Sequence, residues 1–262
     1  MSDTERTTEA ILSSEENRVL YIVFNRYEKK NALNHSMYAR LAALLDHATA
    51  TPSIRAVCFC GSKDIFCGGN DIKDFLSATM QDENAPVLQF LRAVIDFPKP
   101  MVAAVEGAAI GIGTTLLLHC DLVYASKAAY FQTPFTGLAL CPEAASSVLL
   151  PKVVGLTRAS AMLLLGQKID AATALSWGLL TEILPEESFN QSLTKRLNIL
   201  TALPPEAVRA TKALLRAPLR EACQEGLQRE IDLFTQRLSS PEAAEAVQAF
   251  LERRPPDFSH FE

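Results

Sequence analysis

The sequence predicts an α/β fold, with a parallel β-sheet core in residues 1–200 and a helical C-terminal region in residues 201–262. Short apolar runs rich in Val, Ile and Phe alternate with stretches of helical periodicity from about residue 10 to residue 184. Such alternation favours a parallel sheet whose strands are joined by helices. Two of the strand-like runs end in closely spaced glycines, and residues 186–253 are almost entirely helical by pattern.

The first third of the chain predicts a hairpin, a helix and a buried strand. Residues 10–12 and 19–24 are strand-like and predict an opening hairpin. Apolar residues recur at helical spacing over residues 36–50, with Asn34 or Ser36 as the cap. Residues 55–61 predict the next strand, which leads into a glycine turn.

The middle of the chain repeats this pattern. We expect a helix over residues 87–95, a buried strand over 101–105, and an apolar helix over 114–120 after a second glycine turn. The polar segment 77–84 between the first turn and the helix is expected to be mobile. Two further strands are expected, at residues 122–125 and 129–132.

Short helices and one last strand complete the core. Pro142 is well placed as the first residue of a helix, because its missing N–H would have no partner there. Breaks near Gly155 and Gly166 divide the helices that follow. Residues 179–184 are strand-like, and the proline-punctuated remainder is helical.

Composition and charge exclude several classes of protein. The formal net charge of −5 argues against a nucleic-acid-binding surface. The six cysteines form no CxxC pair and no metal-ligand spacing, so we expect free thiols in a reducing cytoplasm and no metal site. The N-terminus lacks the apolar segment of a secretory signal, and no window is apolar enough to span a membrane.

The two glycine turns are the main candidates for a functional site. They are Cys67-Gly68-Gly69-Asn70 and Gly111-Ile112-Gly113. If their strands are neighbours, two backbone N–H groups could converge on one oxygen and form an oxyanion hole. The other interpretation is that the glycines only allow tight turns. A dinucleotide-binding turn is weakly supported, since position 116 is Leu where a third glycine would be needed.

Glu143 is the candidate proton-transferring residue. It lies within an otherwise uncharged stretch from Ala128 to Leu150. Burial there would raise its pKa and suit proton transfer. Alternatively, Pro142-Glu143 is a favourable first turn of a helix, where the helix dipole would lower the pKa. The local sequence leaves both interpretations open.

Over nearly its full length the chain resembles the crotonase, or enoyl-CoA hydratase/isomerase, superfamily. The motifs that carry the resemblance are Asn31-Ala32-Leu33-Asn34, Phe66-Cys67-Gly68-Gly69-Asn70-Asp71-Ile72, Pro98-Lys99-Pro100, Val105-Glu106-Gly107, Ala109-Ile110-Gly111-Ile112-Gly113, Cys120-Asp121-Leu122-Val123-Tyr124-Ala125-Ser126, Phe131-Gln132-Thr133-Pro134-Phe135 and Ala171-Ala172-Thr173-Ala174-Leu175-Ser176-Trp177-Gly178-Leu179. The resemblance implies a crotonase-like spiral of ββα turns with a C-terminal helical trimerisation region. It also implies a homotrimer or a dimer of trimers.

The resemblance implies an acyl-CoA thioester as substrate, with coenzyme A as part of it and no separate cofactor. The N–H groups of Gly68 and Ile112 would form the oxyanion hole. The basic loop around Arg26, Lys29 and Lys30 would lie near the pantetheine and phosphates, and the segment from Gly69 to Lys73 would border the adenine. The implied substrate-binding residues are Arg26, Lys29, Lys30, Gly69, Asn70, Asp71, Ile72, Lys73, Gly111, Thr115 and Phe135.

Departures from the hydratase pattern narrow the implied activity. Thr115 and Phe135 stand at the positions where hydratases of the family have their two catalytic glutamates. Glu143 matches the single glutamate of the Δ3,Δ2-enoyl-CoA isomerase branch. The resemblance therefore implies an isomerase that moves a 3-enoyl-CoA double bond to the 2-trans position. The alternatives are another acyl-CoA enzyme of the superfamily (hydratase, dehydratase, dehalogenase or hydrolase) and a non-catalytic acyl-CoA-binding protein.

Overall fold

The computed structural model of the chain describes residues 9–62, 64–71 and 84–261. Its larger sheet has the strand order β1-β2-β3-β5-β7-β10. The strands are β1 (Ile11–Glu16), β2 (Val19–Phe24), β3 (Ala56–Cys60), β5 (Met101–Val105), β7 (Leu122–Ala125) and β10 (Glu182–Ile183). Only the β1–β2 hairpin is antiparallel, and every other pair in this sheet is parallel. The predicted hairpin and parallel α/β core are confirmed.

A smaller sheet has the order β4-β6-β8-β9. It consists of β4 (Ile65–Cys67), β6 (Ala108–Ile110), β8 (Tyr130–Gln132) and β9 (Ile169–Asp170). Each strand β3, β5 and β7 of the larger sheet is followed in the chain by β4, β6 or β8 of the smaller one. The chain thus winds as a spiral that adds one strand to each sheet per turn.

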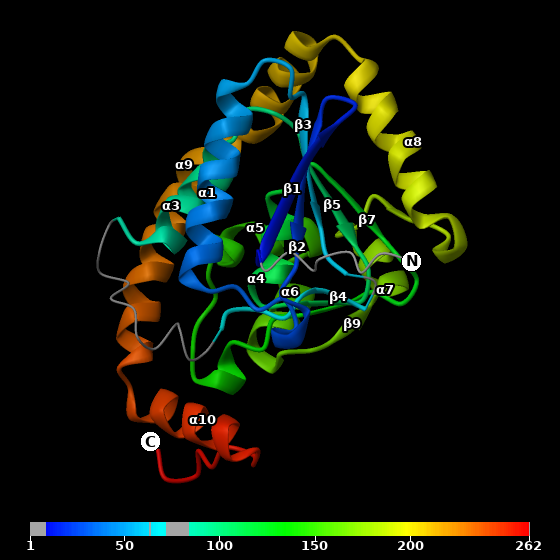
Figure 1. Cartoon of the computed structure of the whole chain (residues 1–262). Coiled ribbons are helices and arrows are strands. Elements are labelled where there is room, and N and C mark those ends of the chain that lie inside the picture. The colour runs from blue at the N-terminus through cyan, green and yellow to red at the C-terminus, as the bar shows by residue number, and fades with distance from the viewer. Residues whose placement is uncertain (1–8, 63, 72–83, 262) are drawn as a thin grey trace.

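Side chains alternate between two faces of the larger sheet, as the period of a strand requires. Val57 and Phe59 of β3 belong to the main core, while Cys58 packs into a second apolar cluster on the opposite face. α1 (His35–Ala50) and α3 (Pro86–Asp96) contribute to the main core. α8 (Phe189–Ala202) covers the second cluster and lies across the sheet from α1, at the right in Figure 1.

Short helices join the last strands. They are α4 (Ile112–Thr115), α5 (Ser146–Val154), α6 (Leu156–Leu165) and α7 (Ala171–Ser176), with 3-10 turns at Tyr27–Lys29, Leu116–Leu118, Thr136–Leu138 and Glu186–Ser188. The predicted helix start at Pro142 is wrong. Ala144 and Ala145 both have left-handed backbone (φ 59° and 55°), so α5 begins only at Ser146. The predicted strand over 179–184 is shortened to β10.

The tail is helical, as predicted, and the expected boundary at residue 200 falls in the last turn of α8. α9 (Pro205–Leu238) runs along one side of the molecule and α10 (Pro241–Glu252) lies at its foot (Figure 1). Pro218 lies inside α9 without ending it. The segment 77–84 falls almost wholly outside the described residues.

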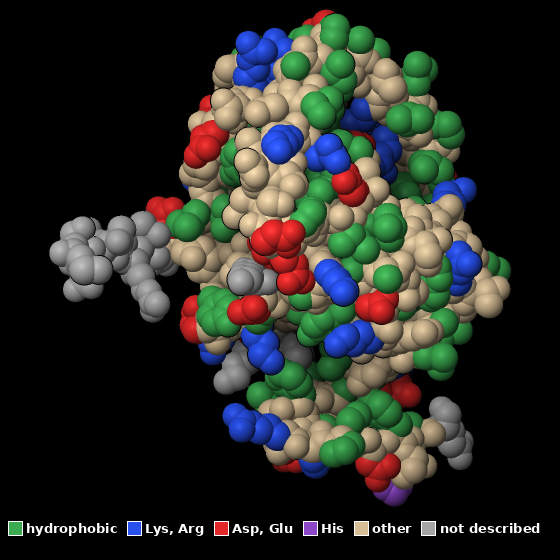
Figure 2. Space-filling view, turned by 90° about the vertical axis from the view of Figure 1, so that its right-hand side faces the viewer, with side chains coloured by type: hydrophobic (Ala, Val, Ile, Leu, Met, Phe, Trp, Pro, Cys, Tyr) green, Lys and Arg blue, Asp and Glu red, His purple; other side chains and the backbone are tan. Residues whose placement is uncertain are grey.

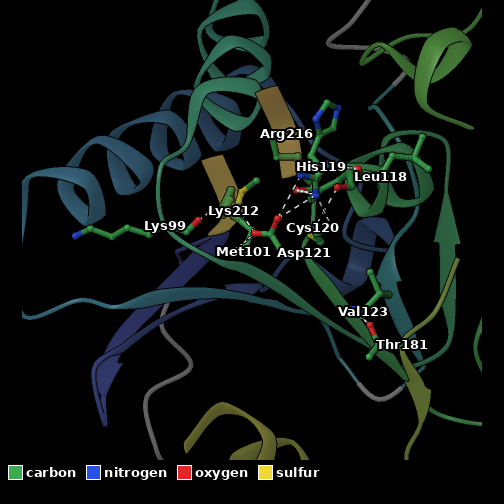
Figure 3. A network of polar contacts seen from close by, with 11 residues as sticks. Lys99, Met101, Leu118, His119, Cys120, Asp121, Val123, Thr181, Lys212 and Arg216 are labelled. Atoms are coloured by element: carbon green, nitrogen blue, oxygen red, sulfur yellow. Dashed lines mark hydrogen bonds and ion pairs between the residues drawn. The ribbon is translucent and has the colours of Figure 1, made fainter. Parts of the chain in front are cut away.

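Asp121 fastens α9 to the core, as Figure 3 shows. Its Oδ2 accepts the Met101 amide (2.8 Å) and pairs with Lys212 Nζ at 2.9 Å. Arg216 pairs with Oδ1 at 3.1 Å and donates to the carbonyls of residues 118–120. These carbonyls end the 3-10 turn after α4, so the long helix is held to the segment that follows the second glycine turn.

No described helix is both long and apolar enough to cross a bilayer. On the face shown in Figure 2, lysine and arginine side chains are interspersed with acidic and hydrophobic ones rather than gathered into one field.

Candidate active site

The two glycine turns lie side by side because their strands are neighbours. β4 pairs with β6 in parallel, so both carboxyl ends reach the same edge of the small sheet. The contact is close. A Cβ at Gly113 would lie 2.7 Å from the carbonyl oxygen of Cys67, and one at Gly111 would lie 3.7 Å from Gly69 Cα. Glycine at 113 therefore permits the approach of the two turns.

The Ile112 amide is free to bind an external oxygen. Gly111 has a backbone (φ 54°, ψ −120°) that favours glycine, and it turns the chain from β6 into α4. Ile112 is the first residue of α4, where an N–H has no acceptor within the helix. Its N–H has no other acceptor among the described residues.

The Gly68 amide is already used within the chain and does not fit the role expected for it. It donates to the Lys30 carbonyl at 2.9 Å. Asn70, two residues after Gly68, pairs with Leu33 in an isolated parallel bridge. In this bridge the Leu33 N–H donates to the Gly69 carbonyl and the Asp71 N–H donates to the Leu33 carbonyl, both at 2.8 Å. Successive peptide groups of an extended chain point to opposite sides. The Asn70 N–H therefore points away from Leu33, and it has no acceptor in the described part of the chain.

Glu143 is buried beside these turns. Its side chain is 8% exposed, and its Oε1 accepts a hydrogen bond of 2.5 Å from Thr115 Oγ1. Burial raises the pKa of Glu143 from an ordinary 4.5 to about 8; the Thr115 bond opposes this rise and the carboxylate of Glu230 adds to it. The carboxyl is thus a stronger base than a solvated one, as proton transfer from carbon requires.

The helix-dipole interpretation of Glu143 does not hold, because α5 starts three residues later. Instead the segment between Glu143 and α5 is held by side chains from elsewhere. Glu230 of α9 accepts the N–H groups of Ala145 (2.6 Å) and Ser147 (2.8 Å). His119 Nε2 lies 2.8 Å from the Ala144 carbonyl, and burial lowers the pKa of His119 to about 4, so it is neutral.

Glu143 faces a small, mostly apolar cavity. The space is about 10 Å³, close to that of one water molecule. Val87 and Leu91 of α3 and Leu227, Ile231 and Phe234 of α9 supply its apolar wall, and Asn70, Glu143, Ala144 and Glu230 complete it. Phe135 is buried near Gly111, with its ring 3.9 Å from the point where a Cβ would stand.

The predicted substrate loop is partly engaged in internal bonds. Arg26 pairs with Asp71 at 2.7 Å and donates to the Ala32 carbonyl at 3.0 Å. Lys29 and Lys30 are exposed at the surface. Ile72 and Lys73, also predicted to bind substrate, lie outside the described residues.

Two residues of the site were not predicted from the sequence. Tyr38 is buried in α1 and donates its hydroxyl to Asn70 Oδ1. Glu230 shares one face of α9 with Leu227, Ile231 and Phe234, and a glutamate among apolar residues at helical spacing is the signal that could have revealed it. Tyr38 gave no comparable signal. Among described residues, no group of three or more His, Cys, Asp or Glu side chains could hold a metal ion.

Known proteins resemble this chain in both sequence and fold. Residues 14–260 match the family model for enoyl-CoA hydratase/isomerase. The chain is 38% identical over 254 residues to enoyl-CoA delta isomerase 2 of Rattus norvegicus, covering 95% of this chain and 65% of that protein. It is 36% identical to a probable enoyl-CoA hydratase of Rhodobacter capsulatus, covering 91% of this chain and 93% of that protein.

Among solved structures, an enoyl-CoA hydratase/isomerase from Pseudoalteromonas atlantica superposes with a TM-score of 0.91 at 42% identity. The match covers 95% of this chain and all of the other. The chain spans about two thirds of the rat relative's length. The sequence match, the shared fold and the parallel glycine turns agree: the chain has the crotonase fold and belongs to the enoyl-CoA hydratase/isomerase family.

Proposed function

We propose that the protein is a Δ3,Δ2-enoyl-CoA isomerase in which Glu143 carries the proton. The observation that carries this proposal is the buried carboxyl of Glu143, beside an apolar wall and two amides that have no acceptor among the described residues. Relatives named isomerase and relatives named hydratase are about equally similar to this chain in sequence, so the choice between these activities rests on the residues of the site.

In the proposed reaction, the ionised Glu143 removes a proton from C2 of a 3-enoyl-CoA. The electron pair of the C2–H bond forms a C1–C2 double bond, and the π electrons of the thioester carbonyl move to its oxygen. The product is a dienolate with C1–C2 and C3–C4 double bonds; the C2–C3 double bond forms when the carbonyl re-forms and C4 takes up the proton. The N–H groups of Ile112 and Asn70 stabilise the negative oxygen; Asn70 replaces the expected Gly68 because its amide is unpaired. Glu143 then returns the proton to C4, and the conjugated 2-trans product leaves.

One carboxyl group suffices for this transfer, and no cofactor besides the CoA of the substrate is required. Hydration would need a second carboxyl to activate water. Among the described residues that line the cavity, Glu230 is the second carboxylate, but both of its oxygens accept backbone N–H groups. It is therefore poorly placed to bind and activate a water molecule.

A direct test compares isomerisation with hydration in one preparation. We expect conversion of 3-hexenoyl-CoA to the conjugated 2-enoyl product, measured by its ultraviolet absorbance, and little hydration of 2-hexenoyl-CoA. Glu143→Gln should abolish turnover and leave CoA binding intact. Efficient hydration together with absent isomerisation would overturn the proposal, and binding without either reaction would indicate a non-catalytic acyl-CoA-binding protein.

We also propose that the protein is a homotrimer or a dimer of trimers. Large apolar side chains are exposed on two tail-side helices, including Leu164 and Leu165 of α6 and Leu214 and Leu215 of α9. A contact between subunits would cover these exposed leucines. Light scattering after gel filtration would give the mass. The cytoplasm is the compartment we propose, in keeping with six free cysteines.

A further inference from the structure

Glu230 is a buried carboxylate that the proposed reaction does not use. It is 5% exposed, within the tail helix α9, and 87 positions along the chain from Glu143. A glutamate is almost never buried this far without partners that compensate for its lost hydration. The partners of Glu230 identify its role.

Both carboxylate oxygens of Glu230 hold the backbone just after Glu143. Oε2 accepts the Ala145 amide at 2.6 Å and Oε1 accepts the Ser147 amide at 2.8 Å. Ala144 and Ala145, which follow Glu143 directly, both have a left-handed backbone. This conformation costs roughly 1 kcal/mol or more for each alanine. The two hydrogen bonds offset this cost, so the turn that aims Glu143 depends on a side chain from α9.

The placement of Glu230 depends in turn on how α9 is anchored. Asp121 holds Lys212 and Arg216 of this helix against the core (Figure 3). Glu230 follows Arg216 by four turns of an α-helix, or about 21 Å. Leu227, Ile231 and Phe234 pack around it at helical spacing and form the cavity wall. One continuous helix therefore supplies both the wall and the carboxylate.

Glu230 also bears on the charge of Glu143, because both carboxyls line one cavity. In the part of the chain that the structure describes, the other titratable groups coupled to the charge of Glu143 are Tyr38 of α1, Cys67 of β4 and Cys141 of the preceding loop. Burial raises the pKa of all three, so they are neutral at pH 7 to 8. α3 contributes only apolar side chains to the cavity.

We propose that Glu230 is a positioning residue for Glu143, because its two hydrogen bonds fix the turn that aims the Glu143 carboxyl into the cavity. Its charge has a second effect, since a carboxylate in the same cavity opposes the ionisation of Glu143. This inference rests on the proposed function. It assigns to α9 a part in the reaction that goes beyond covering the pocket. It also explains why a charged residue occupies an otherwise apolar face of this helix.

The test compares three variants on helix α9. Glu230→Gln keeps the size but removes the charge and one acceptor oxygen. Glu230→Asp keeps the charge with a shorter reach. Glu221→Gln, an exposed acid on the same helix, is the matched control. Each is assayed for isomerisation of 3-hexenoyl-CoA against pH. The titration of Glu143 is followed separately by carbon NMR on protein labelled at glutamate carboxyls, with Glu143→Gln to assign the signal.

For Glu230→Gln we expect the Glu143 midpoint to fall by roughly 0.5 to 1 pH unit, because a like charge nearby has been removed. The pH at which the rate reaches half of its plateau value should decrease by the same amount. On the plateau, kcat should drop at least about tenfold with KM changed less than about threefold, because the carboxyl is no longer aimed. Glu230→Asp should keep the midpoint and lose kcat, and Glu221→Gln should match the wild type.

Several results would overturn the inference. One is a Glu230→Gln variant that matches Glu221→Gln in both midpoint and kcat. Another is a loss of kcat that follows thermal stability alone while the midpoint stays fixed. If Glu230→Gln fails to fold, full kcat in Glu230→Asp would refute the positioning role. Should the wild type not isomerise at all, the proposed function fails, while the NMR midpoints still decide the coupling of the two carboxyls.

Discussion

The hydroxyl of Thr115 partly offsets the rise that burial causes in the pKa of Glu143, and replacing Thr115 by Val tests this directly. The two side chains are similar in shape, so the change removes the 2.5 Å hydrogen bond and leaves the packing almost as it was. A hydrogen bond to a charged group contributes about 1.5–3 kcal/mol. Since 1.36 kcal/mol corresponds to one pKa unit, losing it should raise the pKa of Glu143 by about 1 to 2 units.

The direction of the effect on rate follows from the proposed role of Glu143 as a base. Only the ionised carboxyl can remove a proton, so the wild-type rate should rise with pH through a pKa of about 8. In Thr115→Val this limb should move to higher pH. At pH 7.5 the rate should fall about 10- to 100-fold, and most of it should return above the new pKa.

The assay is the isomerisation of 3-hexenoyl-CoA from pH 6 to pH 10, with Thr115→Ser as the control that keeps the hydroxyl. The control should keep the position of the limb and lose some stability through the missing methyl group. The reasoning would be refuted by a Thr115→Val limb that coincides with the wild type. It would equally be refuted by a loss of rate that is the same at every pH, since that would mean a damaged pocket.

Three further predictions concern stability and close packing. The pKa of Glu143 is raised on folding, so its contribution to stability is complete below about pH 4.5 and is lost as the pH rises through about 8. The free energy of unfolding of Glu143→Gln, measured in urea, should therefore exceed that of the wild type by at least about 1 kcal/mol between pH 6 and pH 9. In Gly113→Ala, the new Cβ would lie 2.7 Å from a carbonyl oxygen of the adjacent glycine turn, so the rate of isomerisation should fall at least about 100-fold. The control Gly137→Ala, whose new Cβ would have no atom within 4 Å, should keep full activity. Asp121→Asn leaves the largely buried Lys212 without its counter-ion and should lower the free energy of unfolding by about 2–4 kcal/mol; an unchanged urea midpoint would contradict this.

The periodic parts of the fold were predictable because burial imposes a period on the sequence. Val57 and Phe59 face one core and Cys58 faces the other, so this strand is buried on both faces and is apolar at successive positions, which is the run that identified it. The start of the helix near Pro142 was predicted wrongly because the rule for a first helical turn considers only local residues. There a distant carboxylate, that of Glu230, satisfies the amides at the start of α5, and the left-handed alanines delay the helix.

The candidate site was predictable where one local motif carries it. Both glycine turns and Glu143 were found in this way, and the pairing of β4 with β6 brings the turns together as expected. The choice of Gly68 rather than Asn70 as a donor to the oxyanion depended on which of their two N–H bonds points away from the segment that contains Leu33. That direction is set by the bridge between Leu33 and Asn70, two residues 37 positions apart, and no local pattern records it.

Thr115 is the position at which sequence and structure complement each other. By resemblance, it marks a site where a hydratase would have a glutamate. In the structure its hydroxyl donates to Glu143, 28 residues further along the chain. A glutamate here would place a second buried charge against Glu143 and raise the pKa of that carboxyl further, whereas threonine supplies a donor that lowers it. The same residue therefore removes a competing carboxylate and stabilises the ionised form of the remaining one. That pairing is what a reaction with a single proton carrier requires.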